Sequence, residues 1–383
     1  MQICICRIRV EYVKLEEICT IVSGGTPSRS KPNYWDNGNI PWIKIKDMKS
    51  KYINSAEEFI TEEGLNNSSA KMLKSDTILY SIFATLGEVG ILKIDACTNQ
   101  AIAGLSLKED SNILKEYLYY YLKSKKKDVN NLGRGVAQNN INLSLLKKFK
   151  IPVMPLHQQK KIVEVLDNVS STTNNYEREL ALLDELVKAR FVEMFGDVQD
   201  AKKRGGQQLK DICNTVAGGT PSTKHVEYYN GTIPWISTVS LGPNYIDGTT
   251  AKAFITQEAV DSSSTKIIPS GSILFGTRVG VGKSSINQVE MCTNQDIVAI
   301  IDLDVSKYNK LYIKYVLDTY QPYFDSIKKG ATILGISSDD LKNIYVPDAS
   351  LYEQNRFEKF VKQIDKSRLL SNHSLSLIKS IIF

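Results

Sequence analysis

The most constraining feature of this sequence is a long internal repeat. The segment SGGTPSRSKPNYWDNGNIPWIK, residues 23–44, recurs as AGGTPSTKHVEYYNGTIPWIS at residues 217–237. Further matched pairs at nearly the same separation are Phe-Ile-Thr at 59–61 and 254–256, CTNQ at 97–100 and 292–295, and Gln159 with Gln354. The period is about 195 residues, whereas solenoid repeats run to about 50 residues. The sequence therefore predicts a duplicated domain.

Each copy changes character towards its end. Before Pro155 and Asp348 there are short apolar runs broken by Gly, Pro and Asn, which are typical of β-strands. Beyond these points apolar residues recur at alternating steps of four and three, the seam of a coiled coil. The apolar seam residues are Ile162, Leu166, Val169, Leu180, Leu183, Val187, Phe357, Val361, Ile364, Leu375 and Ile378, and polar breaks fall at Thr173, Tyr176, Arg368 and Ser371.

Two long helices with registered seams favour pairing with each other over packing as separate surface helices. We therefore expect an α+β protein in which two β-rich domains stand in tandem pseudo-repeat, each followed by a long helix, the two helices pairing as an antiparallel coiled coil. The expected boundaries are residues 1–155 and 197–348 for the β-rich domains and 156–196 and 349–383 for the helices. Such pairing would relate the domains by a pseudo-twofold axis.

Bulk composition is that of a soluble globular protein. Of the 383 residues 42% are hydrophobic and 23% are charged. There is no apolar run of about 18 residues and no pattern of a secretion signal, so we expect no membrane association and a cytoplasmic location. The net charge of +6 permits nucleic-acid binding without requiring it.

The cysteines and histidines do not form a metal-binding pattern. Six cysteines include no C-x-x-C pair, and the three histidines lie far from one another, so no metal site is expected. Cys19 and Cys213, like Cys97 and Cys292, occupy matching places in the two copies. We interpret these four as reduced core residues.

Motifs for catalysis are missing from the sequence. There is no G-x-G-x-x-G after a strand, no Asn-Pro-Pro-Tyr motif and no Asp followed by a Glu-x-Lys metal pair. The stretch GTRVGVGKSS, residues 276–285, resembles a phosphate-binding loop but has Thr277 where glycine is required. These observations disfavour a DNA methyltransferase or nuclease. A coiled-coil scaffold without nucleic acid would explain the heptads but not two divergent β-rich domains.

Taken in order, the repeated motifs resemble those of the specificity subunit of type I restriction-modification systems. They are GGTPS, IPWI and CTNQ in each copy, the helix entries MPLHQQKKIVEVLD and ASLYEQNRFEKFVKQID, and ARFVEMFGD at the end of the first helix. The resemblance implies that each β-rich unit is a target recognition domain that reads one half of a bipartite site in double-stranded DNA. It also implies that the helices set the distance between the two halves.

The same resemblance implies partners and cofactors. Family members do no chemistry of their own and recruit two methyltransferase subunits and, for cleavage, ATP-dependent restriction subunits. S-adenosylmethionine and ATP are then expected in the partner subunits, with no cofactor in this chain.

Candidate DNA contacts lie in loops that differ between the copies. Lys and Arg suit phosphates or guanine, Gln and Asn suit adenine, and Thr suits thymine methyls and phosphates. The candidates are Lys44, Lys46, Arg134, Gln138 and Asn139 in the first domain and Thr223, Lys224, Thr238, Arg278, Lys283 and Thr332 in the second, with Ser28, Arg29 and Lys31 as candidate contacts to the DNA backbone. An ordinary solvated loop explains each of these residues equally well.

Two other repeated elements are interpreted as structural. In GGTPS the glycines are expected to adopt positive φ while Thr-Pro fixes a turn. Trp42 and Trp235 each lie in an apolar Ile-Pro-Trp-Ile setting, which favours a core position over base stacking.

Overall fold

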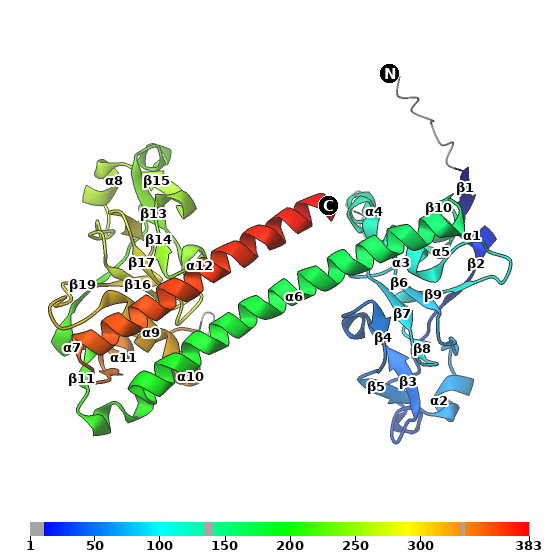
Figure 1. Ribbon diagram of the computed structural model, residues 1–383, viewed down its shortest axis with the longest axis horizontal. Coiled ribbons are helices and arrows are strands. Elements are labelled where there is room, and N and C mark those ends of the chain that lie inside the picture. The colour runs from blue at the N-terminus through cyan, green and yellow to red at the C-terminus, as the bar shows by residue number, and fades with distance from the viewer. Residues whose placement is uncertain (1–10, 134–140, 331–333, 383) are drawn as a thin grey trace. The chain divides into compact units, whose positions relative to one another are not determined.

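The computed structural model describes residues 11–133, 141–330 and 334–382, and side chains within these ranges except those of 131–133 and 380–382 (Figure 1). The chain divides into two compact units. Unit 1 comprises Met1–Asn174 with Ile378–Phe383, and unit 2 comprises Asn175–Leu377.

Unit 1 contains three small sheets and short helices. The strands are β1 (Glu11–Lys14), β2 (Cys19–Ser23), β3 (Ile40–Ile43), β4 (Tyr52–Ile53), β5 (Glu58–Ile60), β6 (Ile78–Ser81), β7 (Val89–Leu92), β8 (Cys97–Thr98), β9 (Ile102–Leu107) and β10 (Lys150–Val153). The helices are α1 (Leu15–Ile18), α2 (Glu62–Asn66), α3 (Lys115–Ser124), α4 (Lys126–Gly133) and α5 (Leu143–Lys147). The sheet orders are β2-β9-β6-β7-β4, β5-β3-β8 and β1-β10.

Unit 2 repeats this plan. Its strands are β11 (Gln207–Gln208), β12 (Asn214–Ala217), β13 (Ile233–Ile236), β14 (Tyr245–Ile246), β15 (Ala253–Ile255), β16 (Ile273–Gly276), β17 (Ser284–Asn287), β18 (Cys292–Thr293), β19 (Ile297–Ile301) and β20 (Tyr345–Val346). Its short helices are α7 (Leu209–Ile212), α8 (Gln257–Asp261), α9 (Lys310–Thr319), α10 (Gln321–Ile327) and α11 (Ser338–Lys342). The sheet orders, β12-β19-β16-β17-β14, β15-β13-β18 and β11-β20, match those of unit 1 strand for strand.

The repeated sequence motifs meet in the three-stranded sheet. Trp42 pairs in parallel register with Cys97, and Trp235 does the same with Cys292. Each indole Nε1 donates a hydrogen bond of 3.0 Å to the carbonyl oxygen of Gly25 or Gly219. Trp42 is 2% exposed and Trp235 5% exposed. The core position expected for both tryptophans is therefore confirmed.

The GGTPS glycines are required for a different reason from the one expected. None of Gly24, Gly25, Gly218 and Gly219 has positive φ. Instead a Cβ on Gly25 would lie 2.3 Å from the carbonyl carbon of Ser69, and one on Gly219 would lie 2.4 Å from the backbone nitrogen of Thr265. The expectation of positive φ was wrong, and close approach of two backbone segments accounts for the glycines.

The repeated Phe-Ile-Thr motif ends a strand and begins a helix. Thr61 caps α2 by accepting a 3.1 Å hydrogen bond from the Gly64 amide, and Thr256 caps α8 by accepting one of 3.2 Å from Ala259. Threonine at this position satisfies an amide that the first helical turn leaves without a partner. The motif thus serves the scaffold in both units.

Two long helices follow the β-rich parts, α6 (Leu156–Phe195) and α12 (Leu351–Ile382). Each carries a buried glutamine near its start, Gln159 or Gln354. Each side-chain carbonyl accepts a 2.8 Å bond from a backbone amide, that of Leu114 or Asn309. Each side-chain amide donates to two backbone carbonyls. The repeated glutamine therefore anchors the start of each helix to its own unit.

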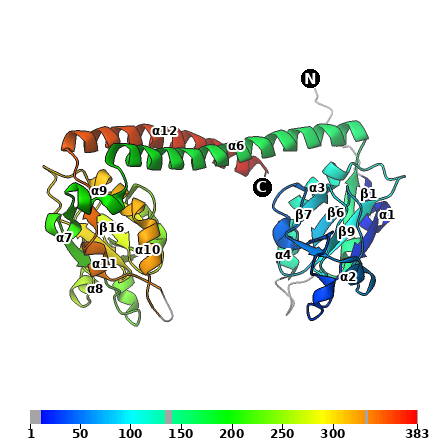
Figure 2. The same ribbon diagram turned by 90° about the horizontal axis from the view of Figure 1, so that it is seen from below.

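Within unit 2 the end of α6 packs antiparallel against α12, as Figures 1 and 2 show. Phe191 and Phe357 stack edge-on at 5.5 Å, and Glu179, further back along α6, accepts a hydrogen bond from Ser371, further along α12. Val187 and Val361 join Phe357 in the main core of the unit. The predicted architecture, two β-rich domains each followed by a long helix with antiparallel helix pairing, is confirmed.

Candidate nucleic-acid interface

Basic side chains of unit 1 gather beside the three-stranded sheet. This sheet lies on the side of the domain away from α6 (Figure 1). Arg29 and Lys44 both form ion pairs with the carboxylate of Glu58 on β5. We call these three residues the Glu58 cluster. Next to it Lys46 forms an ion pair with Glu57, and Lys49 lies 3.7 Å from the same carboxylate. The positive charge of this surface is therefore arranged around two adjacent glutamates.

Arg29 is also held by an aromatic face. Its guanidinium carbon lies 3.5 Å from the ring centroid of Trp35. Trp35 is fixed in turn, because its ring packs edge-on against Trp42 at 5.0 Å and its Nε1 donates to the Ser28 carbonyl at 3.1 Å. Cation–π stacking adds about 0.5–1 kcal/mol at an exposed site. The Arg29 side chain is 54% exposed, so the stacked group remains open to solvent.

The carboxylates of this surface stay ionised near neutral pH. Burial alone would raise the pKa of Glu58, but the hydrogen bonds from Lys44 and Arg29 outweigh it and lower that pKa. A hydrogen bond from Lys46 lowers the pKa of Glu57 and raises that of Lys46. The cluster is thus a network of full charges.

The remaining candidates near this sheet are ordinary exposed groups. Lys31 donates a 2.9 Å hydrogen bond to the Tyr34 hydroxyl, and the hydroxyls of Ser28 and Ser30 lie 2.8 Å apart. In unit 2 the matching loop carries Thr223 and Lys224, both exposed. Thr238 is only 4% exposed, so its side chain lies below the surface of the domain.

A second basic surface lies in unit 2, beside the turn between β16 and β17. Arg278, with 58% of its side chain exposed, lies 3.9 Å from the Asp296 carboxylate, and Lys283 is exposed on the same turn. The backbone amide of Ile336 donates a 2.8 Å hydrogen bond to the carbonyl oxygen of Thr277. This bond holds the segment around Ile336 against the turn. A hollow of about 550 Å³ lies between them, lined by Arg278, Lys329, Gly335, Ile336, Ser337 and Asp340.

Four candidates, Arg134, Gln138, Asn139 and Thr332, lie outside the described residues. Glu58 and Trp35 were not predicted from the sequence as part of the basic surface of unit 1. Comparison of the copies contained a signal for Glu58, because it stands beside the shared Phe-Ile-Thr motif where the second copy has Ala253.

The helix-pairing candidates fall into three groups. In unit 2, Val187, Phe357 and Val361 are at most 1% exposed, Leu375 is 9% exposed, and Leu180, Leu183 and Ile364 are partly buried. In unit 1, Ile162 packs against the core of the β-rich domain, and Leu166 and Val169 follow it on α6. Ile378 lies on α12 just beyond the end of unit 2.

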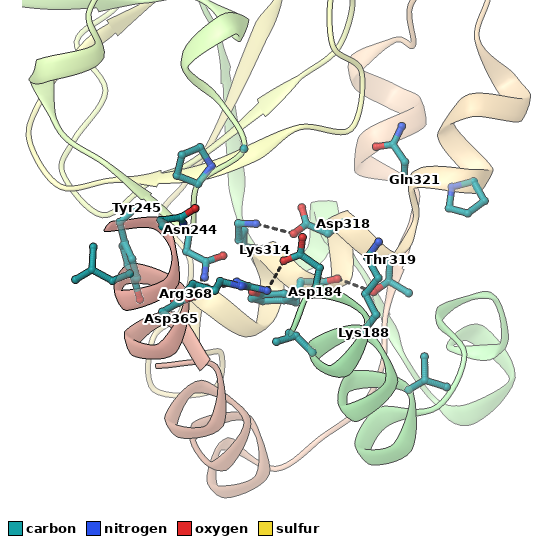
Figure 3. Close-up of a pocket in the computed structure, with 18 of the residues that line it drawn as sticks. Asp184, Lys188, Asn244, Tyr245, Lys314, Asp318, Thr319, Gln321, Asp365 and Arg368 are labelled. Carbon is teal, nitrogen blue, oxygen red and sulfur yellow. Dashed lines mark hydrogen bonds and ion pairs between the residues drawn. The ribbon is translucent and has the colours of Figure 1, made fainter. Parts of the chain in front are cut away.

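A charged cavity of about 970 Å³ lies where the helix pair meets the rest of unit 2 (Figure 3). Arg368 forms ion pairs with Asp184 at 2.5 Å and with Asp365 at 2.9 Å. Asn244 donates to Asp365 at 2.8 Å, and the buried Lys314 forms an ion pair with Asp318 at 2.6 Å. The Arg368–Asp184 pair joins the two helices and the Asn244–Asp365 bond joins α12 to the β-rich part, so this cavity is a structural junction.

In the part of the chain that the structure describes, no group of three or more His, Cys, Asp or Glu side chains could hold a metal ion. No helix among the described residues is long and apolar enough to cross a membrane. Among the described residues, the candidate site consists of basic, acidic, aromatic and hydroxyl side chains presented on two similar scaffolds.

Two copies of one β-rich domain, each with its own set of exposed polar loops, define a two-module recognition protein. The family model described as "Type I restriction modification DNA specificity domain" matches residues 8–185 and again 206–380. The chain belongs to this family.

Individual relatives are specificity subunits of type I restriction enzymes. The chain is 36% identical over 172 residues to the type I restriction enzyme EcoR124I/EcoR124II specificity subunit of Escherichia coli, covering 43% of this chain and 42% of the relative. It is 32% identical over 185 residues to the MjaIX specificity subunit of Methanocaldococcus jannaschii, covering 45% and 42%. In both cases the matched region spans less than half the length of the curated relative.

Solved structures share the fold over nearly the whole chain. A chain from work on complex assembly and conformational transition of the type I R-M system has a TM-score of 0.61 at 16% identity, covering 97% of this chain and 95% of that chain. The S subunit of a type I restriction-modification system from M. genitalium has a TM-score of 0.53 at 15% identity, covering 98% and 95%.

Proposed function

We propose that this chain is the sequence-specific DNA-binding subunit of a type I restriction-modification complex. Each β-rich domain reads one half of a bipartite duplex target, and the chain performs no chemistry of its own. The observation that carries the proposal is one scaffold built twice with different surface chemistry. Trp42 and Trp235 hold equivalent loops in place, while Lys44 of the first copy is replaced by Ser237 in the second.

The division of labour follows the four segments of the sequence. Residues 1–155 and 197–348 are the proposed recognition domains, and 156–196 and 349–383 are the proposed spacer helices. The proposed contact set among described residues is Ser28, Arg29, Lys31, Lys44, Lys46, Thr223, Lys224, Arg278 and Lys283. The exposed Lys and Arg side chains of this set supply phosphate contacts and, where geometry allows, guanine contacts. Lys44 is partly buried and contributes through its ion pair with Glu58.

The proposed partners supply the chemistry. Two methyltransferase subunits bring S-adenosylmethionine, and restriction subunits bring ATP-dependent cleavage. The helices are proposed to set the separation of the half-sites and to receive the methyltransferase subunits. Because the proposed ligand is chromosomal DNA, we place the complex in the cytoplasm.

Single-molecule methylation sequencing tests this function. The full chain is expressed with its methyltransferase subunits in a host lacking other adenine methylation. We expect one bipartite motif, methylated on both strands, with two unlike halves at a fixed separation. Omitting this chain is the control and should abolish methylation. A continuous motif, or methylation that persists without this chain, would refute the proposal.

A further inference from the structure

The Arg29 side chain is restrained from two directions. Trp35 covers one face of the guanidinium at 3.5 Å, and the Glu58 carboxylate takes a hydrogen bond from Nη2. Among the described residues no hydrogen bond is made by Nη1 or Nε of Arg29, and 54% of the side chain is exposed. The restrained group therefore presents unused donors to solvent in a defined plane.

Glu58 is itself fully engaged as a positioning group. One carboxylate oxygen accepts from Arg29 and the other from Lys44. The Lys44 side chain is only 18% exposed. The result is a chain of contacts from the half-buried Lys44 through Glu58 to the exposed Arg29.

The second domain lacks all three charged residues at once. Strand register aligns Glu58 with Ala253, because these residues lie opposite Trp42 and Trp235, respectively. The GGTPS and IPWI motifs likewise align Arg29 with Thr223 and Lys44 with Ser237. The aromatic platform remains, since Tyr229 packs edge-on against Trp235 at 6.2 Å. The scaffold therefore does not need the Glu58 cluster to fold.

A fixed guanidinium plane matters for one kind of DNA contact. A phosphate is satisfied by a mobile positive charge, which lysine supplies. The O6 and N7 acceptors of guanine require two coplanar donors, and arginine is the residue that most often supplies them. Stacking and carboxylate pairing reduce the ordering that such a contact would otherwise require.

We propose that Arg29 reads a guanine in the half-site of the first domain, with Glu58 and Trp35 as positioning residues that hold its guanidinium for this contact. This inference rests on the DNA-recognition function proposed above and names one specificity determinant within it. The second domain, with Thr223 at the matching place, makes no equivalent guanine contact.

The test uses the full chain with its methyltransferase subunits and duplexes carrying the wild-type motif. Each G·C pair of the first domain's half-site is replaced in turn, and the affinity of each duplex is measured at several salt concentrations. For Arg29→Ala we expect discrimination at one G·C pair to fall by about 5- to 150-fold, the equivalent of losing one bidentate contact. Discrimination at the other pairs should stay at the wild-type value.

Two further variants separate positioning from charge. Arg29→Lys keeps the charge but loses the planar fork, so it should lose the same discrimination as Arg29→Ala. Glu58→Gln removes a negative charge from the DNA-facing surface. It should bind nonspecific duplex as tightly as wild type or more tightly, while losing discrimination at the same G·C pair. If Glu58 only stabilised the fold, Glu58→Gln would weaken specific and nonspecific DNA binding together.

Lys46→Ala is the matched control, because Lys46 is similarly exposed and also paired with a glutamate. It should weaken all duplexes equally and reduce the slope of log affinity against log salt by about one. If Arg29→Ala behaves in this way, or Arg29→Lys keeps full discrimination, the proposed guanine contact is wrong. If Glu58→Gln discriminates as wild type does, the positioning role is wrong. Absence of a bipartite motif for the wild type would instead refute the proposed function.

Discussion

Asp184 on α6 and Arg368 on α12 form an ion pair of 2.5 Å between Oδ1 and Nη2. In the sequence Arg368 is one of the polar breaks in the apolar seam. In the structure it joins two antiparallel helices and also contacts Asp365 at 2.9 Å. The break is therefore a specific contact of the helix pair in unit 2.

A double-mutant cycle measures this contact. Because Asp184 is 64% exposed, we expect Asp184→Asn and Arg368→Gln to show a coupling free energy of about 0.2–1 kcal/mol in urea unfolding. High salt should reduce the coupling. A coupling of zero at low salt would mean that the two side chains do not interact in solution.

The apolar seam should be far less tolerant of charge than the outer face of the same helix. Val361 is fully buried, whereas Leu370 is 70% exposed. We expect Val361→Asp to lower the free energy of unfolding by roughly 3–5 kcal/mol, because the carboxylate would be buried without a partner. Leu370→Asp is the matched control and should change stability by less than about 0.5 kcal/mol. Equal effects of the two substitutions would contradict the helix packing described for unit 2.

The repeated cysteines should be unreactive in the folded protein. Burial raises the pKa of Cys97 to about 11 and that of Cys292 to about 11. At pH 8 their thiolate fraction is then roughly a hundredfold below that of an ordinary thiol. We expect alkylation with iodoacetamide, followed by peptide mass spectrometry, to label both residues only after denaturant is added. Rapid labelling of either one in buffer would show that its strand is not packed as described.

The helices are proposed to set the distance between the half-sites. Inserting four residues near Ser171 adds about 6 Å of helix rise and roughly one turn, which keeps the seam nearly aligned. One base pair of B-DNA rises 3.4 Å, so the methylated motif should keep both halves and gain one or two base pairs between them. A fully active variant with the original spacing would mean that another component sets the distance.

The repeat made much of the fold predictable. Two copies of a motif must serve the same scaffold, and Trp42 with Trp235 and Gln159 with Gln354 make matching contacts in the structure. The role of the GGTPS glycines could not be predicted in the same way. Gly25 is required by its distance from Ser69, 44 positions along the chain, and sequence spacing carries no information on such an approach.

The candidate site was less predictable for a related reason. Residue type indicated that Arg29 and Lys44 suit DNA, but not that both are paired with Glu58, since the three come from separate segments that only the folded sheet brings together. Thr238 has suitable chemistry, but its side chain is buried.

The most direct test of the account uses the chain's own duplication. Residues 11–155 are replaced by the matching residues 206–350, so that both recognition domains are copies of the second one. The variant is expressed with the methyltransferase subunits, and its motif is compared with that of the wild type by single-molecule methylation sequencing. The account predicts a symmetric motif in which the wild-type half-site of the second domain appears twice, as an inverted repeat, at the wild-type separation. A motif that still contains the half-site of the first domain, or one in which both halves are new, would contradict independent reading by two domains.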